Sequence, residues 1–160
     1  MIRKATEKDI QAAMELFTAA KSIMRSDGNM TQWEGNYPNE EIVRSDISKD
    51  GAHIVEHDGK PVGYFALLPS PEPTYSSIDG KWLDDSAPYY VIHRIASSPD
   101  SHGVFREIIE YSLSVSCNLR IDTHHDNHIM RHVIEKAGFI YCGVINLTDG
   151  SERLAFQKMI

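Results

Sequence analysis

The residues best placed to do chemistry lie between Val91 and Ile109, where a strand-like segment, a Ser/Gly turn and a helix follow one another. The first backbone N–H groups of a helix have no partner within it and carry partial positive charge, so they suit a phosphate or pyrophosphate. Gly103, in the turn, would let such an anion approach closely because glycine has no side chain. A strand-to-helix turn without a ligand explains the same spacing, so this feature alone leaves both interpretations open.

His93, in the strand before the turn, is a candidate general base. An imidazole can take a proton from an ammonium group near physiological pH, because its ordinary pKa is close to neutrality. The residue alternates with Val91 and Ile95, and a histidine packed and hydrogen-bonded within the sheet explains this position equally well. His124, at the end of the next expected strand, is a weaker candidate for the same role.

Several histidines between residues 124 and 132 raise the question of a metal site. His128 and His132 are four residues apart, so they would project from one turn of a helix, as two zinc ligands do. The same face also holds Arg131 and Glu135, opposite the apolar stripe. A solvated helix face explains this pattern better, and we therefore expect no metal.

Aromatic residues gather in the expected loops between the first helix and the central strand: Trp33, Tyr37, Tyr75, Trp82 and Tyr89. Aromatic rings commonly line the walls of small-molecule pockets. Acidic residues of the same loops would attract an amine, among them Glu34, Asp79, Asp84 and Asp85. The rings therefore predict a pocket for an amine, with a small satellite core sealed by loop aromatics as the alternative.

Hydrophobic periodicity predicts the elements that must position these residues. Strands are expected at 2–5, 52–56, 62–68, 89–96, 119–123, 139–147 and 153–159, and helices at 10–24, after 39, at 104–115 and at 128–137. Asn127 is the expected N-cap of the last helix, and Gly138 is expected to end it. The prolines that begin the stretch 69–88 predict a loop there.

The composition is that of a globular protein of one domain, residues 1–160. Hydrophobic residues make up 41% of the chain and charged residues 24%, close to globular averages. The net charge of −7 argues against a nucleic-acid partner, because such binding needs basic residues that neutralise phosphates. Cys117 and Cys142 are too few for a disulfide framework, and no apolar stretch is long enough to cross a bilayer. We expect a cytoplasmic protein that does not contact membranes.

Three segments of the chain together carry a family resemblance. The most specific is Asn127–Phe139, which follows a strand and ends in Glu-Lys-Ala-Gly-Phe. His93–Pro99 and the opening Ile2–Ile10 add to it. These segments resemble the GNAT superfamily of acyl-CoA-dependent N-acyltransferases, and the resemblance covers all 160 residues. It implies an α+β fold with a mixed, mostly antiparallel twisted sheet flanked by helices, in the order β-α-α-β-β-β-α-β-α-β-β.

The resemblance also implies where the cofactor binds. The pantetheine of acyl-CoA would run along the strand that ends at Ile95, Ala96 and Ser97, like an added strand. The pyrophosphate would rest on the next loop, at Ser101, His102, Gly103, Val104, Phe105 and Arg106, and the Asn127 side chain would reach the cofactor. A backbone N–H near Ile95 or Ala96 would stabilise the oxyanion of the reaction.

The chain departs from the family pattern at three places. Asp100 and Phe105 stand beside the loop glycine, where the family usually has Arg or Gln and Gly or Ala, and Met130 replaces a small residue. Ile134 stands where the family frequently has a tyrosine that protonates the departing CoA thiolate, which isoleucine cannot do. These positions favour a second hypothesis, a protein that binds acyl-CoA without transferring the acyl group.

We predict an N-acyltransferase that moves an acetyl group from acetyl-CoA to a primary amine of a small molecule or peptide. The alternative is a non-catalytic acyl-CoA-binding or sensing module, and a histidine-ligated metalloprotein is a further rival. Homodimers are frequent among proteins that resemble this chain, which makes a homodimer a hypothesis for its assembly.

Overall fold

Eight strands form one sheet in the computed structural model, which describes residues 1–160. The strands are β1 (Ile2–Lys4), β2 (Ala52–His57), β3 (Lys60–Pro69), β4 (Asp79–Gly80), β5 (Tyr90–Ser97), β6 (Asn118–Thr123), β7 (Ile140–Asn146) and β8 (Glu152–Met159). The helices are α1 (Ile10–Ser26), α2 (Glu40–Ser48), α3 (Val104–Val115) and α4 (His128–Lys136), with short 3-10 helices at Glu7–Asp9 and Pro73–Tyr75. Apart from the two-residue β4, this is the predicted order, and the predicted mixed α+β fold is confirmed.

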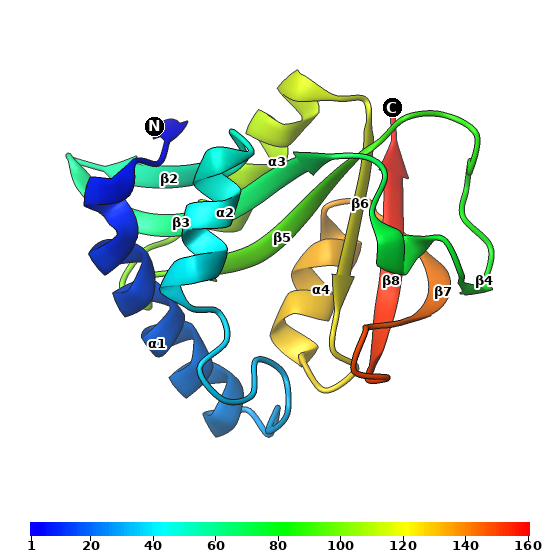
Figure 1. Ribbon diagram of the computed structural model, residues 1–160, viewed down its shortest axis with the longest axis horizontal. Coiled ribbons are helices and arrows are strands. Elements are labelled where there is room, and N and C mark those ends of the chain that lie inside the picture. Colours follow the sequence, from blue (N-terminus) through cyan, green and yellow to red (C-terminus); the bar gives the residue numbers. More distant parts are fainter.

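The middle of the sheet contains its one parallel pair, β5 and β6, in the strand order β1-β2-β3-β5-β6-β8-β7-β4. This ladder runs only from Tyr90↔Leu119 to Ile92↔Ile121. Beyond it the strands separate, and Figure 1 shows β5 and β6 side by side at one end and diverging toward their C-terminal ends. In open sheets with helices on both faces, such a place outside the carboxyl ends of parallel strands is where ligands bind.

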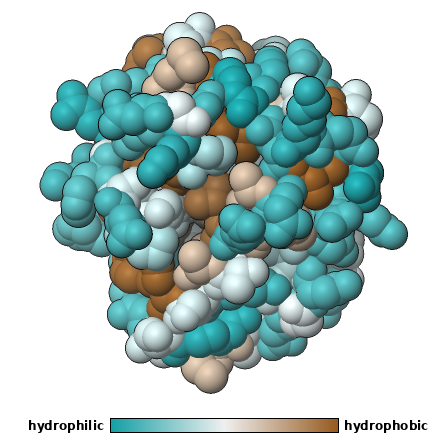
Figure 2. Space-filling view, turned by 90° about the vertical axis from the view of Figure 1, so that its left-hand side faces the viewer, coloured by the Kyte–Doolittle hydropathy of each residue, from teal (hydrophilic) through white to brown (hydrophobic).

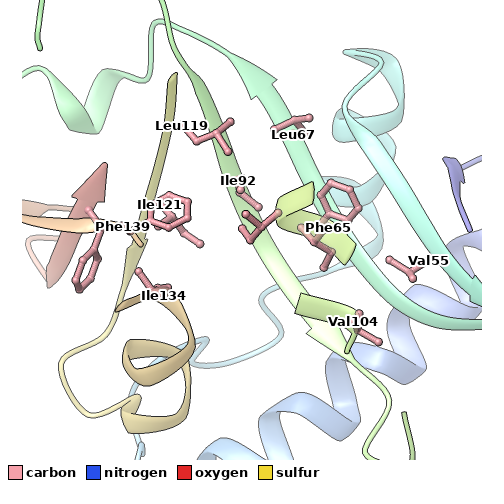
Figure 3. Close-up of a cluster of buried hydrophobic side chains, with 12 residues drawn as sticks. Val55, Phe65, Leu67, Ile92, Val104, Leu119, Ile121, Ile134 and Phe139 are labelled. Atoms are coloured by element: carbon pink, nitrogen blue, oxygen red, sulfur yellow. The ribbon is translucent and has the colours of Figure 1, made fainter. Parts of the chain in front are cut away.

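Two helices cover each face of the sheet. α1 and α2 lie over β2 and β3, where the Phe17 ring meets the Tyr64 ring edge to face at 5.2 Å and Ile54 is fully buried. α3 and α4 cover the opposite face (Figure 1). There Ile134 of α4 points toward Ile121 of β6, in a cluster that also contains Ile92 of β5 (Figure 3). The burial of this apolar cluster stabilises the contact between the two halves of the sheet.

Short-range capping and turn signals account for the element boundaries. The Asn39 side chain accepts a hydrogen bond from Ile42 N at 3.0 Å and so caps α2. At α4 the predicted N-cap is confirmed. The predicted end of that helix is also confirmed, because Gly138 has a φ of +90° that glycine adopts without strain. The backbone of Asp58 and Gly59 likewise has positive φ, as a tight hairpin turn between β2 and β3 requires.

The stretch 69–88 contains more structure than the expected loop. Pro73 begins a turn of 3-10 helix, and β4 pairs with β7 through Asp79↔Val144 and Gly80↔Gly143. A Cβ atom on Gly80 would come within 2.1 Å of the Cys142 carbonyl oxygen, so this close approach of two backbones requires glycine. A pairing of two residues between distant segments leaves no periodic signal in the sequence.

The outer surface is mainly polar on the side that Figure 2 presents, with small separate hydrophobic areas. None of the helices combines the length and the apolar character needed to cross a membrane.

Candidate active site

A cavity of about 540 Å³, here called the central cavity, opens where β5 and β6 separate. Its walls come from the segment after α1, from the Pro-rich loop before the central strands, from β5, β6 and the start of α4, and from the β7–β8 turn. The lining residues are Met24, Thr31, Gln32, Trp33, Glu34, Tyr37, Glu72, Thr74, Ile92, His93, Arg94, Ile95, Ile121, Asp122, Thr123, Asn127, Met130, Leu147, Thr148, Asp149, Ser151 and Arg153. Segments far apart in the sequence therefore meet at one site.

A β-bulge in β5 lies on the wall of the central cavity. His93 pairs with Ala66 of β3 and Ala96 pairs with Tyr64, so two residues of β5 stand opposite the single residue between those partners. Arg94, one of the two, has a φ of +55°, which is uncommon outside glycine. The extra residue of a bulge is left out of the ladder. We therefore expect a backbone N–H of Arg94 or Ile95, both of which line the cavity, to lie outside the ladder.

A buried ion pair holds this bulge in place. The Arg94 guanidinium donates from Nε and Nη2 to the two carboxylate oxygens of Asp46, at 2.9 and 2.6 Å. The Tyr64 hydroxyl donates to the same carboxylate at 2.7 Å, and the Tyr37 hydroxyl accepts from Arg94 at 3.1 Å. Burial and the nearby Asp46 raise the pKa of Tyr64, so its hydroxyl stays protonated. The network also sets the position of Tyr37 in the cavity wall.

His93 faces the central cavity as half of an acid–base pair. Its Nε2 lies 3.1 Å from Glu72 Oε1, and both side chains are about four-fifths buried, with 19% and 20% exposure. The other carboxylate oxygen of Glu72 accepts from Thr74 N at 3.2 Å, which fixes the carboxylate. The hydrogen bond with His93 lowers the pKa of Glu72. With Nε2 donating to Glu72, Nδ1 is the ring nitrogen that can accept a proton.

Glu72 is a site residue that the sequence reasoning missed. It lies in the Pro-rich stretch, 21 positions before His93, with Pro71 and Pro73 on either side. The Tyr89 hydroxyl accepts a hydrogen bond from Glu72 N at 3.0 Å and so anchors the backbone there. A carboxylate between two prolines is a weak signal, and only the fold brings it to the imidazole.

The predicted pyrophosphate loop forms an open helix start. Gly103, with a φ of +76°, is the N-cap of α3, and no side chain caps the helix there. The first N–H groups of α3, which include those of Val104 and Phe105, are therefore free. A Cβ atom on Gly103 would meet nothing within 4 Å, so there is open space beside this residue.

The remaining loop residues lie around this helix start. Ser101 and Phe105 are half-buried, Val104 is buried, and His102 and Arg106 are exposed. The Ser101 hydroxyl donates to Ser98 O at 2.6 Å, and the Arg106 guanidinium pairs with Glu110 at 2.8 Å. The polar side chains of Ser101 and Arg106 are thus engaged within the protein.

Asn127 lies on the wall of the central cavity and is 7% exposed. Its side-chain oxygen accepts from Met130 N at 3.1 Å, and its amide nitrogen donates to Gln32 Oε1 at 3.0 Å. The residue therefore joins the start of α4 to the segment after α1. Met130 also lines the cavity, whereas Ile134 is fully buried in the apolar cluster of Figure 3.

The five loop aromatics divide into two groups. Trp33 and Tyr37 line the central cavity. The structure does not bring Tyr75, Trp82 and Tyr89 there: they belong to a satellite core, which was the alternative for these rings. The physical reason is Arg120, whose buried guanidinium carbon lies 3.9 Å from the Trp82 ring centre and 3.8 Å from that of Tyr89. Aromatic faces stabilise a cation that burial removes from water.

The histidines after β6 do not reach the central cavity. His124 Nε2 lies 2.8 Å from the Thr31 hydroxyl, and its Nδ1 accepts from Asp126 N at 3.0 Å. Ligand atoms of His124, His125 and Asp126 lie within 4.8 Å of one another, but both ring nitrogens of His124 are already hydrogen-bonded within the protein. Burial lowers the pKa of His124. His128 and His132 are exposed on α4.

Comparisons with known proteins identify relatives by structure. No family model matches the chain, and no curated protein matches it. The solved structure of a GNAT-family acetyltransferase from Streptococcus agalactiae 2603 superimposes with a TM-score of 0.92 and 33% sequence identity, covering 100% of this chain and 95% of that one.

Two more distant structures share the fold. A GNAT-family acetyltransferase from Listeria monocytogenes 4b F2365 has a TM-score of 0.73 at 18% identity, covering 100% of this chain and 94% of that one. The ribosomal-protein-S18-alanine N-acetyltransferase from Escherichia coli has a TM-score of 0.65 at 17% identity, covering 100% and 93%.

Proposed function

The chain belongs to the GNAT family of acetyltransferases, and on this premise we propose that it transfers an acetyl group from acetyl-CoA to a primary amine of a small molecule or peptide. The observation that carries the proposal is the His93–Glu72 pair, which lies on the wall of the central cavity beside the bulge in β5. A proton acceptor and a free backbone N–H are the two groups that aminolysis of a thioester needs.

The start of α3 suits the pyrophosphate of coenzyme A, because no side chain caps its N–H groups and there is open space beside Gly103. The edge of β5 suits the pantetheine. The Ser98 N–H donates to Val62 O, on the β3 side, at 2.8 Å. Successive residues of a strand direct their backbone N–H and C=O groups to opposite sides, so those of Ser97 are directed away from β3, toward the gap before β6. Asn127 contributes by fixing the start of α4, since both ends of its amide are already hydrogen-bonded.

In the proposed reaction, Nδ1 of His93 takes a proton from the bound ammonium group. The free amine then attacks the thioester carbonyl, and the backbone N–H at Arg94 or Ile95 stabilises the oxyanion. Attack forms the C–N bond, and collapse of the tetrahedral species breaks the C–S bond. Because Ile134 has no proton to give, the proton held by His93 passes to the thiolate, and His93 then takes the second proton of the former ammonium group from the nitrogen and releases it to water. Glu72 positions the imidazole and stabilises it while it is charged.

The rival hypothesis of a non-catalytic acyl-CoA-binding or sensing module is favoured by one observation: the fully buried Ile134 in place of a proton donor. A single experiment separates the two. Acetyl-CoA is titrated into the protein in a thermal-shift assay, and release of the CoA thiol is then followed with a panel of amines. Stabilisation by acetyl-CoA together with amine-dependent thiol release supports the enzyme. Stabilisation without release on any amine supports the binding module.

Three further hypotheses accompany this proposal: a single N-acetyltransferase-like domain over residues 1–160, a cytoplasmic location and a homodimer. Gel filtration can test the homodimer, and cell fractionation can test the location.

A further inference from the structure

We infer that the amine acceptor also carries a carboxylate, and that Arg153 binds this carboxylate at the end of the central cavity remote from His93. The inference deepens the proposed function and rests on it. It is drawn from the contacts of one arginine and from the order of three side chains across the sheet.

Arg153 is a buried cation without an anionic partner. Its residue exposure is 8%, and no carboxylate lies within ion-pair distance of its guanidinium. One nitrogen, Nη1, donates to Glu152 O at 2.8 Å and to Ser151 Oγ at 3.5 Å, whereas Nε and Nη2 make no hydrogen bond. A buried charge is costly unless it is paired and hydrogen-bonded. Two free donors of a buried guanidinium on a cavity wall are therefore available to an anionic ligand.

The other two deeply buried arginines have such partners. Arg94 forms its two-point contact with Asp46, and the Arg120 side chain, which is 1% exposed, pairs with Asp85 and stacks between aromatic rings. Each of these two guanidinium groups therefore has a carboxylate partner within the chain. Arg153 differs from both because no carboxylate of the chain lies within ion-pair distance of it.

Arg153 and His93 lie on one face of the sheet with Asp122 between them. His93 of β5 and Asp122 of β6 each follow the last pair of the parallel ladder, Ile92↔Ile121, at the point where the two strands begin to separate. Asp122 is opposite Ala155 of β8, and Arg153, two residues away, shares its face because side chains alternate along a strand. Paired strands are about 4.8 Å apart, so the base and the guanidinium are separated by more than two strand spacings, which is over roughly 10 Å. An acceptor that spans them has its amine and its anion several bonds apart.

The charges around the central cavity favour a carboxylate over a phosphate. Glu34, Glu72, Asp122 and Asp149 also line it, which suits an ammonium group and opposes a dianion. Asp149 lies nearest in sequence to the arginine, but its carboxylate accepts from Ser151 N at 2.9 Å and from the Ser151 hydroxyl at 2.6 Å. Arg94, the other arginine of this cavity, is paired with Asp46, so the one unpaired guanidinium in an acidic cavity matches a single negative charge.

The experiment compares dipeptides and 6-aminohexanoate, each as the free acid and as its carboxamide, with phosphoethanolamine as a further probe. Binding to the wild-type protein with CoA is measured by calorimetry, and acetylation by thiol release. We expect the free acids to bind and react at least about tenfold better than the amides, a difference of about 1.4 kcal/mol. R153Q should remove this preference and leave the amides unaffected, whereas R153K should keep part of it. R131Q, at another arginine without an ion pair but outside the cavity, is the matched control.

Equal binding of acids and amides by the wild-type protein, or a preference for phosphoethanolamine, would overturn the inference. These results do not depend on whether R153Q folds. Binding of the acids without turnover would support carboxylate recognition while contradicting the proposed transfer. Turnover of the amides alone would support the proposed transfer while contradicting carboxylate recognition. A failure of the inference can thus be distinguished from a failure of the proposed function.

Discussion

Arg94 and Asp46 form a two-point ion pair, with Nε–Oδ2 and Nη2–Oδ1 distances of 2.9 and 2.6 Å, directly behind the bulge of β5. The Asp46 side chain is 1% exposed and that of Arg94 9%, so the pair is almost completely removed from water. It connects α2 to the strand that carries the candidate base. The stability of the fold and the position of the proposed base therefore depend on the same contact.

Asp46→Asn should destabilise the fold strongly, because it leaves the Arg94 guanidinium buried without its counter-charge. Breaking one partner of a buried pair costs about 3–5 kcal/mol. Urea denaturation measures the free energy of unfolding. Glu40→Gln, which removes the exposed pair with Arg44 on the same helix, is the control and should leave stability unchanged within error. Equal stability of Asp46→Asn and wild type would show that the buried pair does not hold the bulge.

His93→Gln should lower kcat on the order of 10²- to 10⁴-fold if His93 is the general base. The difference in activity between the variant and the wild type should shrink as the pH rises, because more of the amine is then unprotonated before it binds. Profiles of kcat/KM against pH for the two proteins check this, because kcat/KM includes the ionisation of the free amine. A profile parallel to that of the wild type would remove His93 from the mechanism.

Glu72→Gln tests a positioning role in the same pair. The amide can still accept a hydrogen bond from His93 Nε2, but it cannot stabilise a charged imidazole. We expect kcat to fall less than in His93→Gln and its pH profile to shift. The Km for acetyl-CoA should stay the same, because Glu72 lies apart from the start of α3. A change confined to that Km would contradict this role.

Gly103→Glu should weaken coenzyme A binding, on the order of tenfold or about 1.4 kcal/mol, by adding negative charge where the pyrophosphate is proposed to bind. Gly103→Gln is the matched control: it imposes the same strain at a φ of +76° without the charge. Calorimetric titration gives both affinities. Identical affinity of the two variants for CoA would refute the assignment of the loop.

His53 should make the fold less stable in acid. Burial lowers its pKa to about 4, so the folded state holds the imidazole neutral, whereas the unfolded chain takes up a proton near pH 6.5. Stability is complete above pH 6.5 and falls as the pH drops toward 4, by at most about 3 kcal/mol. His53→Phe, which retains a ring against Phe65, should flatten the dependence of unfolding free energy on pH over this range. An unchanged slope would exclude His53 as its source.

Local signals in the sequence predicted most of the fold. The cap at Asn127 and the glycine that ends α4 depend on neighbours in the chain, and both are present in the structure. β4 was missed because its pairing with β7 spans more than 60 residues and involves only two in each strand.

The candidate site was less predictable because its contacts are long-range. His93 could be named from its residue type and strand, but Glu72 could not, because folding alone brings the Pro-rich loop to β5. The loop aromatics had the right composition for a pocket. Trp82 and Tyr89 cover Arg120 instead, and Tyr75 packs against both rings. No local pattern reveals that an arginine in β6 needs such a cover.

The short ladder between β5 and β6 has a mechanical consequence. With so few backbone hydrogen bonds across the seam, side-chain volume fixes how far the two half-sheets stand apart, and Ile92, Ile121 and Ile134 supply that volume. These three isoleucines act as a spacer that sets the width of the central cavity. Replacing one of them with alanine would change that width and would also destabilise the core.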